Sequence, residues 1–289
     1  MKTKLYTAIG LMSGTSMDGI DASLIKSDGI NEYINLSDEF YKFEENLYQK
    51  LFKLRDLVNH EDDLLKYSED LSKLDRELAI FHSKIVADIS QKYKKKIDLI
   101  GFHGQTIFHN SNLGISRQIG DGRLLSQLTR QKVVYDFRQD DIKNGGQGAP
   151  LTPIFHNLLS KILNTKNKIQ YPICFLNIGG VSNITVTLDD KKMLNNKFNA
   201  FDIGPGNCLI DQWILKNTKY KYDDNGSIAK SGTIDQLILN QAIENFKINS
   251  YKQSMDIKDF DISFARGLSL ENGCSTITAF TAHLIARGI

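Results

Sequence analysis

Two stretches built on the same plan, one in each half of the chain, most constrain what this sequence can fold into. Residues 9–21 and residues 173–186 each contain an apolar run, a turn of small polar residues and a second run of alternating character. This pattern predicts two β-hairpins with small-residue tips. Small residues let a backbone approach a ligand closely, and successive N–H groups and hydroxyls can surround phosphate oxygens. One such tip is more often an ordinary tight turn, but two copies predict a duplicated α/β fold that closes on a nucleotide.

Length and composition set the class of protein. The chain has 289 residues, of which 41% are hydrophobic and 24% charged, as in an ordinary globular protein large enough for two domains. We expect a first domain over residues 1–135 and a second over residues 136–289, each with one of the two hairpins. The net charge of +2 is too balanced to indicate a nucleic acid or a membrane surface as partner.

The cysteines and the apolar runs indicate a compartment. Three cysteines without a C-x-x-C pair give neither a disulfide framework nor a zinc site, and they fit a reduced environment. The apolar run near the N-terminus is too short for a signal peptide. No stretch approaches the roughly 20 apolar residues of a membrane span. The sequence therefore predicts a cytoplasmic protein without a metal site of its own.

Helical periodicity is clearest over residues 71–89. Leu71, Leu74, Leu78 and Ile85 recur there at spacings of three, four and seven, which predicts a long amphipathic helix. Shorter helices are expected over residues 44–58, 124–128, 151–163, 209–215 and 276–289.

Two polar residues follow a predicted strand at residues 97–102. His103 and Gln105 lie at the carboxyl end of this strand, the end where ligands bind in open α/β sheets. Both side chains can hydrogen-bond a sugar hydroxyl. A hydrogen-bonded structural histidine is an equally good interpretation of His103.

A second candidate follows the short strand predicted at residues 133–135. Arg138 offers a planar donor fork that suits a carboxylate or a phosphate. The alternative is a structural ion pair of Arg138 with Asp136 or Asp141. The Gly-rich residues 144–148 that follow are unsuited to regular structure, so their backbone can face a ligand.

The second half contains a candidate catalytic carboxylate. Asp202 ends a predicted strand beside two glycines and ahead of a helix N-terminus, where backbone dipoles favour an ionised and fixed carboxylate. The alternative is that Asp202 or Asn207 only caps this helix. Asp211, one turn into the helix, is a rival carboxylate that we interpret as structural.

Five motifs together resemble the anhydro-N-acetylmuramic acid kinase family of the sugar kinase/Hsp70/actin superfamily. In the order of that family, they occupy residues 10–21, 101–106, 136–138, 145–151 and 201–207. The resemblance implies a two-domain actin-like ATPase fold. It also implies ATP-dependent phosphorylation of 1,6-anhydro-N-acetylmuramic acid with hydrolytic opening of the anhydro ring. The product would be N-acetylmuramic acid 6-phosphate, in cell-wall sugar recycling.

The resemblance also implies a role for each candidate residue. Asp202 is the general base that activates the attacking water, and Mg²⁺ arrives on the nucleotide. The implied nucleotide-binding residues are Gly14, Thr15, Ser16, Met17, Asp18, Gly19, Ile20, Asp21, Gly179, Gly180 and Ser182. The implied sugar-binding residues are His103, Gln105, Arg138, Gln147, Gly148 and Asn207.

The sequence also departs from the family. Family members continue with a Gly-Gly-Gly turn that holds the adenosine and a Glu that contacts the sugar, and no such triplet occurs here. We therefore expect a truncated chain whose second domain lacks its C-terminal adenosine-binding part. The expected partner is a small-molecule sugar, with a homodimer as a further expectation. Alternative functions are a catalytically impaired remnant that binds sugar or a partner, and a kinase for another hexose or amino sugar.

Overall fold

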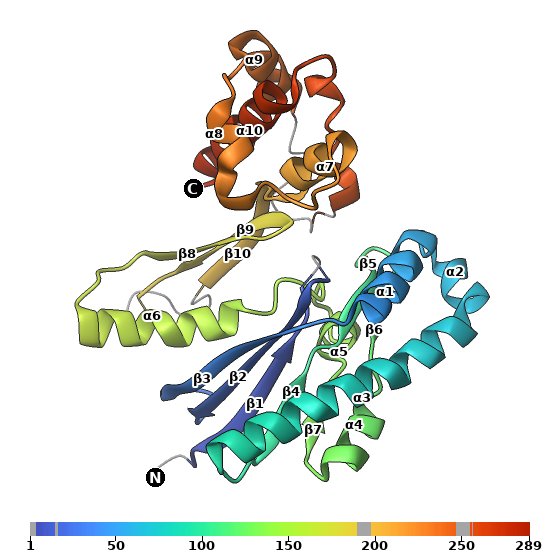
Figure 1. Cartoon of the computed structure of the whole chain (residues 1–289). Coiled ribbons are helices and arrows are strands. Elements are labelled where there is room, and N and C mark those ends of the chain that lie inside the picture. The colour runs from blue at the N-terminus through green and yellow to red at the C-terminus, as the bar shows by residue number, and fades with distance from the viewer. Residues whose placement is uncertain (1–3, 15–16, 190–197, 247–254, 256) are drawn as a thin grey trace. The chain divides into compact units, whose positions relative to one another are not determined.

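The computed structural model describes residues 4–14, 17–189, 198–246, 255 and 257–289 (Figure 1). By its internal contacts the chain divides into two compact units, Met1–Leu151 and Thr152–Ile289, which we call the first and the second unit. Both units combine a sheet with helices, so the mixed α/β class predicted from the sequence is confirmed.

A five-stranded mixed sheet forms the centre of the first unit, in the order β3-β2-β1-β4-β7. Strands β1, β2 and β3 are antiparallel neighbours, whereas β4 runs parallel to β1 and β7 parallel to β4. A separate hairpin joins β5 to β6. Because β1 and β4 are parallel, the residues that follow them meet at one edge of the sheet. The strands are β1 Tyr6–Met12, β2 Gly19–Ser27, β3 Tyr33–Lys42, β4 Leu99–Phe102, β5 Gln105–Asn110, β6 Ile115–Ile119 and β7 Val133–Val134.

The longest helix of the first unit, α3, runs along this sheet (Figure 1). It buries Leu71, Leu74, Leu78 and Ile85 in a core shared with β1 and β2, which confirms the predicted amphipathic helix. No helix in the described part of the chain has the length and apolar character needed to cross a membrane. The helices of this unit are α1 Glu45–Leu57, α2 Glu61–Lys66, α3 Ser68–Tyr93, α4 Gly122–Thr129 and α5 Phe137–Lys143.

The second unit contains a three-stranded antiparallel sheet in the order β10-β9-β8. Helix α6 packs on β9 and β10, and α10 contacts α7, α8, α9 and β10. Ile277, Phe280 and Leu284 of α10 are buried in a core with Trp213 of α7. The elements are α6 Pro153–Asn167, β8 Ile173–Ile178, β9 Val181–Thr187, β10 Phe198–Pro205, α7 Cys208–Asn217, η1 Asp224–Gly226, α8 Ser227–Ser231, α9 Gln236–Asn245, η2 Ile257–Asp259, η3 Ser263–Ala265 and α10 Leu270–Gly288.

The predicted strands and helices differ from the structure mainly between residues 133 and 151. Strand β7 ends at Val134, and α5 begins at Phe137, so Arg138 lies in the first turn of a helix rather than at a strand end. Helix α5 packs on β6, and the Arg138 side chain donates to the Gly148 carbonyl. These contacts hold residues 137–151 to the first unit, and the compact units divide after Leu151.

Helix α3 provides a direct test of this core. Leu78 is fully buried on α3, whereas Leu65 on α2 is 79% exposed. Replacing a buried leucine removes apolar contacts and leaves a cavity, so Leu78→Ala should lower the free energy of unfolding by about 2–5 kcal/mol. Chemical denaturation measures this loss. Leu65→Ala is the control and should leave the unfolding midpoint nearly unchanged; equal effects of the two variants would contradict the packing of α3.

Candidate functional site

The first hairpin tip lies between β1 and β2. Thr15 and Ser16, two of the expected nucleotide ligands, lie outside the described residues. On either side of them, the Met17 amide donates to the Gly14 carbonyl at 3.3 Å, and the Phe43 amide donates to the Asp18 carbonyl at 3.1 Å. The first hydrogen bond connects the residues on either side of the tip, and the second connects Asp18 to the start of the segment after β3.

The hairpin tip carries two carboxylates. The pKa of Asp21 is raised by partial burial and by the nearby charges of Asp18 and Asp38. The neighbouring carboxylates Asp18 and Asp38 add negative charge here, which opposes bare phosphates and favours a phosphate group that carries a cation. Ile20, between the two carboxylates in sequence, is fully buried and anchors the strand in the core.

Gln105 contacts the hairpin from β5. The Ser13 hydroxyl lies 2.5 Å from Gln105 Oε1 and 3.0 Å from the Gly19 carbonyl oxygen, and its one hydrogen can be donated to either. Gln105 Nε2 donates to the Gly14 carbonyl at 3.1 Å. Gln105 is fully buried, so its carboxamide is engaged with the hairpin in this structure. The sequence interpretation missed Ser13, although it continues the alternation of buried residues in β1.

A second group of predicted residues comes together around His103. Arg138 Nε donates to His103 Nε2 at 3.0 Å, and Arg138 Nη1 donates to the Gly148 carbonyl at 2.9 Å. Because an arginine only donates, His103 Nε2 is an acceptor, and Nδ1 carries the proton that it donates to the Gly104 carbonyl at 2.7 Å. Asp141 accepts from the Gly148 amide at 2.8 Å.

Burial and charge keep His103 neutral. Desolvation, followed by the adjacent Arg138 guanidinium, lowers the pKa of His103 to about 4. A neutral imidazole can accept the arginine hydrogen bond, whereas an imidazolium would repel it. His103 and Gly148 therefore fix the orientation of Arg138. Gln147 is exposed in the adjoining loop.

The second hairpin tip is joined to the first turn of α7. The amides of Gly206 and Asn207 donate to the carbonyls of Gly180 and Gly179 at 2.9 and 2.7 Å. A side chain on Gly206 would place its Cβ 2.1 Å from the Gly179 oxygen, so this close approach requires glycine. Ser182 is fully buried and donates to the Pro205 carbonyl at 3.2 Å. The tip is therefore hydrogen-bonded to the last residue of β10 and to the two residues that follow it.

Asp202 lies on β10 where the register with β9 shifts between Asp202 and Gly204. Its side chain is buried, and its Oδ2 accepts from the Met255 amide at 2.8 Å. Asn207 makes no side-chain capping hydrogen bond at α7, and its Nδ2 donates to the Ile178 carbonyl at 3.4 Å. Nothing in the sequence pointed to Met255 as a partner of Asp202.

Helix α7 carries two ionisable groups, Asp211 and Cys208, whose pKa values are raised. Burial raises the pKa of Asp211 to about 6 and the pKa of Cys208 to about 11. A thiol with that pKa is unsuited to act as a nucleophile, and the buried Cys208 side chain packs in the core of the second unit. Among the residues that the structure describes, no three His, Cys, Asp or Glu side chains gather as a metal-binding group.

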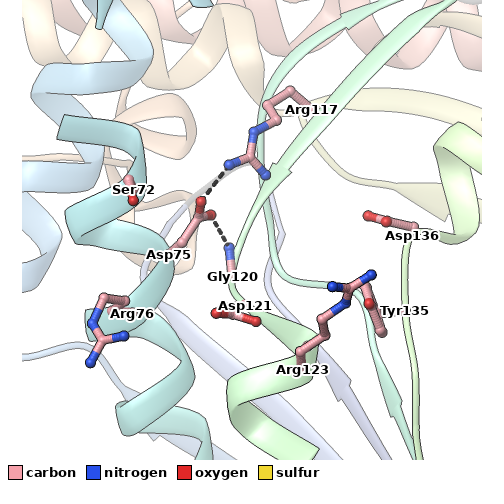
Figure 2. Close-up of a pocket in the computed structure, with 10 residues that line it drawn as sticks. Ser72, Asp75, Arg76, Arg117, Gly120, Asp121, Arg123, Tyr135 and Asp136 are labelled. Carbon is pink, nitrogen blue, oxygen red and sulfur yellow. Dashed lines mark hydrogen bonds and ion pairs between the residues drawn. The ribbon is translucent and has the colours of Figure 1, made fainter. Parts of the chain in front are cut away.

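The first unit also contains a polar hollow of about 440 Å³. Its lining includes none of the candidate site residues. Figure 2 shows Asp75 at its centre, accepting from Arg117 Nη2 at 2.5 Å and from the Gly120 amide at 2.8 Å. Asp121 accepts from the Leu124 amide as the cap of α4. These contacts hold the connection from β6 to α4. The lining residues are Ser72, Asp75, Arg76, Arg117, Gly120, Asp121, Gly122, Arg123, Tyr135 and Asp136.

The lowered pKa of His103 predicts a pH dependence of stability. The ordinary pKa of 6.5 holds in the unfolded chain and about 4 in the folded one. Between these values the unfolded chain binds the extra proton, so this stabilisation is present above pH 6.5 and is lost as the pH falls toward 4. His103→Gln should therefore lose less stability than the original chain over this window, by up to about 1.4 kcal/mol per pH unit.

Chemical denaturation at pH 7, 6 and 5 measures this difference. The exposed His283 of α10 supplies the control, because His283→Gln should follow the original chain across the series. Parallel stability curves for His103→Gln and the original chain would show that His103 is not held neutral by its surroundings. Comparing the variants removes the contributions of the other buried groups, which all three proteins share.

Comparison with known proteins identifies the family. The family model for anhydro-N-acetylmuramic acid kinase matches residues 6–254. Curated proteins named anhydro-N-acetylmuramic acid kinase from Pelagibacter ubique, Brucella canis and Zymomonas mobilis are 50%, 36% and 36% identical to this chain. The alignments cover 99%, 98% and 98% of the chain and 75%, 75% and 76% of the relatives. The chain therefore belongs to the anhydro-N-acetylmuramic acid kinase family.

Proposed function

We propose that this sugar kinase transfers a phosphoryl group from ATP to 1,6-anhydro-N-acetylmuramic acid while water opens the anhydro ring. The product is N-acetylmuramic acid 6-phosphate, which returns a cell-wall sugar to metabolism. The observation that carries this proposal is the Asp202 carboxylate, which a main-chain hydrogen bond from Met255 orients beside the register shift of β10. Membership of the kinase family supports the substrate.

The first hairpin tip has the chemistry that a magnesium nucleotide requires. ATP supplies the phosphoryl group, and Mg²⁺ neutralises phosphate charge in such transfers. Carboxylate oxygens are favoured Mg²⁺ partners, and Asp18 and Asp21 place two carboxylates at this tip, near enough for Asp18 to raise the pKa of Asp21. We also assign Gly14, Thr15, Ser16, Met17, Gly19 and Ile20 to the nucleotide site. We likewise assign Gly179, Gly180 and Ser182 of the second hairpin to nucleotide binding.

Arg138 is the group we assign to the carboxylate of the sugar. The muramyl substrate carries a lactyl carboxylate, and a guanidinium recognises a carboxylate through parallel N–H donors. The hydrogen bonds of Arg138 to His103 and Gly148 restrict its rotamers before the substrate binds. A side chain that is already oriented loses less entropy on binding. Gln147, Gly148 and Asn207 complete the proposed sugar contacts.

Asp202 is the proposed general base. It accepts a proton from water as the water oxygen forms a bond to C1 of the sugar. The bond from C1 to O6 breaks, and its electron pair leaves O6 with negative charge. O6 then forms a bond to the γ-phosphorus of ATP, while the bond from this phosphorus to the oxygen that bridges it to the β-phosphate breaks and ADP leaves. One carboxylate thereby supports both events, because opening the bridge creates the phosphoryl acceptor.

Substitution of Asp202 tests the general base. Asp202→Asn keeps the shape of the side chain and removes its ability to accept a proton, so turnover should fall by at least about 10²-fold. ATP binding, measured by titration calorimetry, should change little. Asp211→Asn is the matched control, one turn into the adjoining helix, and should retain turnover. Normal turnover by Asp202→Asn would exclude Asp202 from this role.

Isotope labelling tests the ring opening. In ¹⁸O-water, hydrolytic opening places one label at C1 of the product during turnover, because the attacking water becomes the anomeric hydroxyl. Mass spectrometry of early time points detects the label, and unlabelled product incubated in the same water corrects for anomeric exchange. A kinase for an ordinary hexose or amino sugar would phosphorylate its substrate without this label.

A further inference from the structure

We infer that Gln105 is a positioning residue that holds the nucleotide-binding hairpin in its binding conformation, and that it is not a ligand of the sugar. This inference rests on the proposed function, because it takes the tip between β1 and β2 as the phosphate site. It assigns to Gln105 a role in ATP binding although the side chain touches no nucleotide atom.

The contacts of the carboxamide carry this inference. Gln105 Oε1 and Nε2 meet Ser13 Oγ and the Gly14 carbonyl at 2.5 and 3.1 Å. Ser13 Oγ also lies 3.0 Å from the carbonyl of Gly19, at the other end of the tip. One buried carboxamide therefore contacts both residues that lead into Thr15 and, through Ser13, reaches the residue that closes the turn.

The backbone of Gln105 is itself fixed. Gly104 has φ +71°, and a Cβ at this position would lie 2.4 Å from the Ile119 carbonyl oxygen. Gln105 pairs with Ile119 across β5 and β6, and the His103 amide donates to the Leu11 carbonyl at 3.1 Å. The turn that carries the carboxamide is thus tied both to β6 and to the end of β1. A side chain with a fixed origin and no exposed surface can hold the residues on either side of the tip in one conformation.

The same turn separates two functions. His103, before Gly104, contacts Arg138, whereas Gln105, after Gly104, contacts the hairpin. Loss of the Gln105 carboxamide should therefore weaken ATP binding and leave sugar binding unchanged. If Gln105 were a ligand of the sugar, its loss would raise the KM for the sugar and leave the KM for ATP unchanged. If Gln105 served only the stability of the fold, its loss would change neither Michaelis constant.

Gln105→Met tests this assignment, because methionine has a similar length and lacks both hydrogen-bonding groups. The KM for ATP should rise by about tenfold, because the hairpin loses the hydrogen bonds from this carboxamide. The KM for the anhydro sugar should stay within about twofold, below the effect of one lost hydrogen bond. Gln118→Met is the matched control. Gln118 is a buried glutamine of β6 whose Nε2 donates to Ser116 Oγ at 2.8 Å, so its loss should leave the KM for ATP unchanged.

Three results would overturn the inference. A raised KM for the sugar with a normal KM for ATP would make Gln105 a sugar ligand. Unfolding midpoints that fall equally in Gln105→Met and Gln118→Met, with both Michaelis constants unchanged, would make its role only structural. Additive effects of Ser13→Ala and Gln105→Met on the KM for ATP would show that the two side chains do not act through one hydrogen bond.

Two further measurements keep the test decisive. Should Gln105→Met fail to fold, Ser13→Ala alone removes one partner of the carboxamide and should raise the KM for ATP in the same direction. The dissociation constant of ATP, measured by calorimetry without sugar, reports on the hairpin whatever the acceptor is. Failure of the original chain to phosphorylate the anhydro sugar would therefore overturn the proposed function, whereas the effect of Gln105→Met on ATP binding would still decide this inference.

Discussion

The candidate site of the first unit depends on one tight connection between β4 and β5. Gly104 brings this turn against the main chain of Ile119, where no side chain fits. The pairing of Gln105 with Ile119 and the hydrogen bond from the His103 amide to the Leu11 carbonyl hold the two neighbours of Gly104 in place. His103 reaches the helix that carries Arg138, and Gln105 reaches the hairpin tip. The connection therefore positions two groups of residues that come from distant parts of the sequence.

The second unit is organised by an analogous main-chain contact. The amides of Gly206 and Asn207, which precede α7, and of Cys208, its first residue, donate to the carbonyls of Gly180, Gly179 and Gly180 in that order. This pairing connects the second hairpin to the loop that follows β10. Asp202 receives its hydrogen bond from Met255 instead of from the amides of α7. The carboxylate is thus oriented by a segment that lies far away in the sequence.

Charge state and packing are coupled around His103. A histidine at its ordinary pKa would be partly charged near neutral pH, and its charge would oppose that of Arg138. Burial and the guanidinium together lower its pKa to about 4, so the imidazole acts as an acceptor. The Arg138 guanidinium stays charged, and the neutral His103 imidazole helps to set its orientation.

Local sequence patterns were sufficient to predict most of the strands and helices. The alternation in β1 and β2, the small-residue tips and the spacing of apolar residues in α3 follow from local preferences and were correctly predicted. Arg138 was wrongly predicted to lie at a strand end. The apolar and aromatic residues 133–135 predicted a strand, whereas β7 contains only Val133 and Val134. Packing of α5 on β6 also assigned residues 137–151 to the first unit, which no local pattern reveals.

The sequence by itself determined the kinds of residue available for the site and the turns on which they lie, since turn chemistry depends on neighbouring residues. Motif order also indicated the family, which the comparisons confirm. Only the tertiary structure decided which groups meet: Gln105 with Ser13, His103 with Arg138, and Asp202 with Met255. The physical reason is that a hydrogen bond between residues far apart in the chain depends on the relative placement of whole strands and helices. That placement is set by core packing and strand register, to which each site residue contributes little.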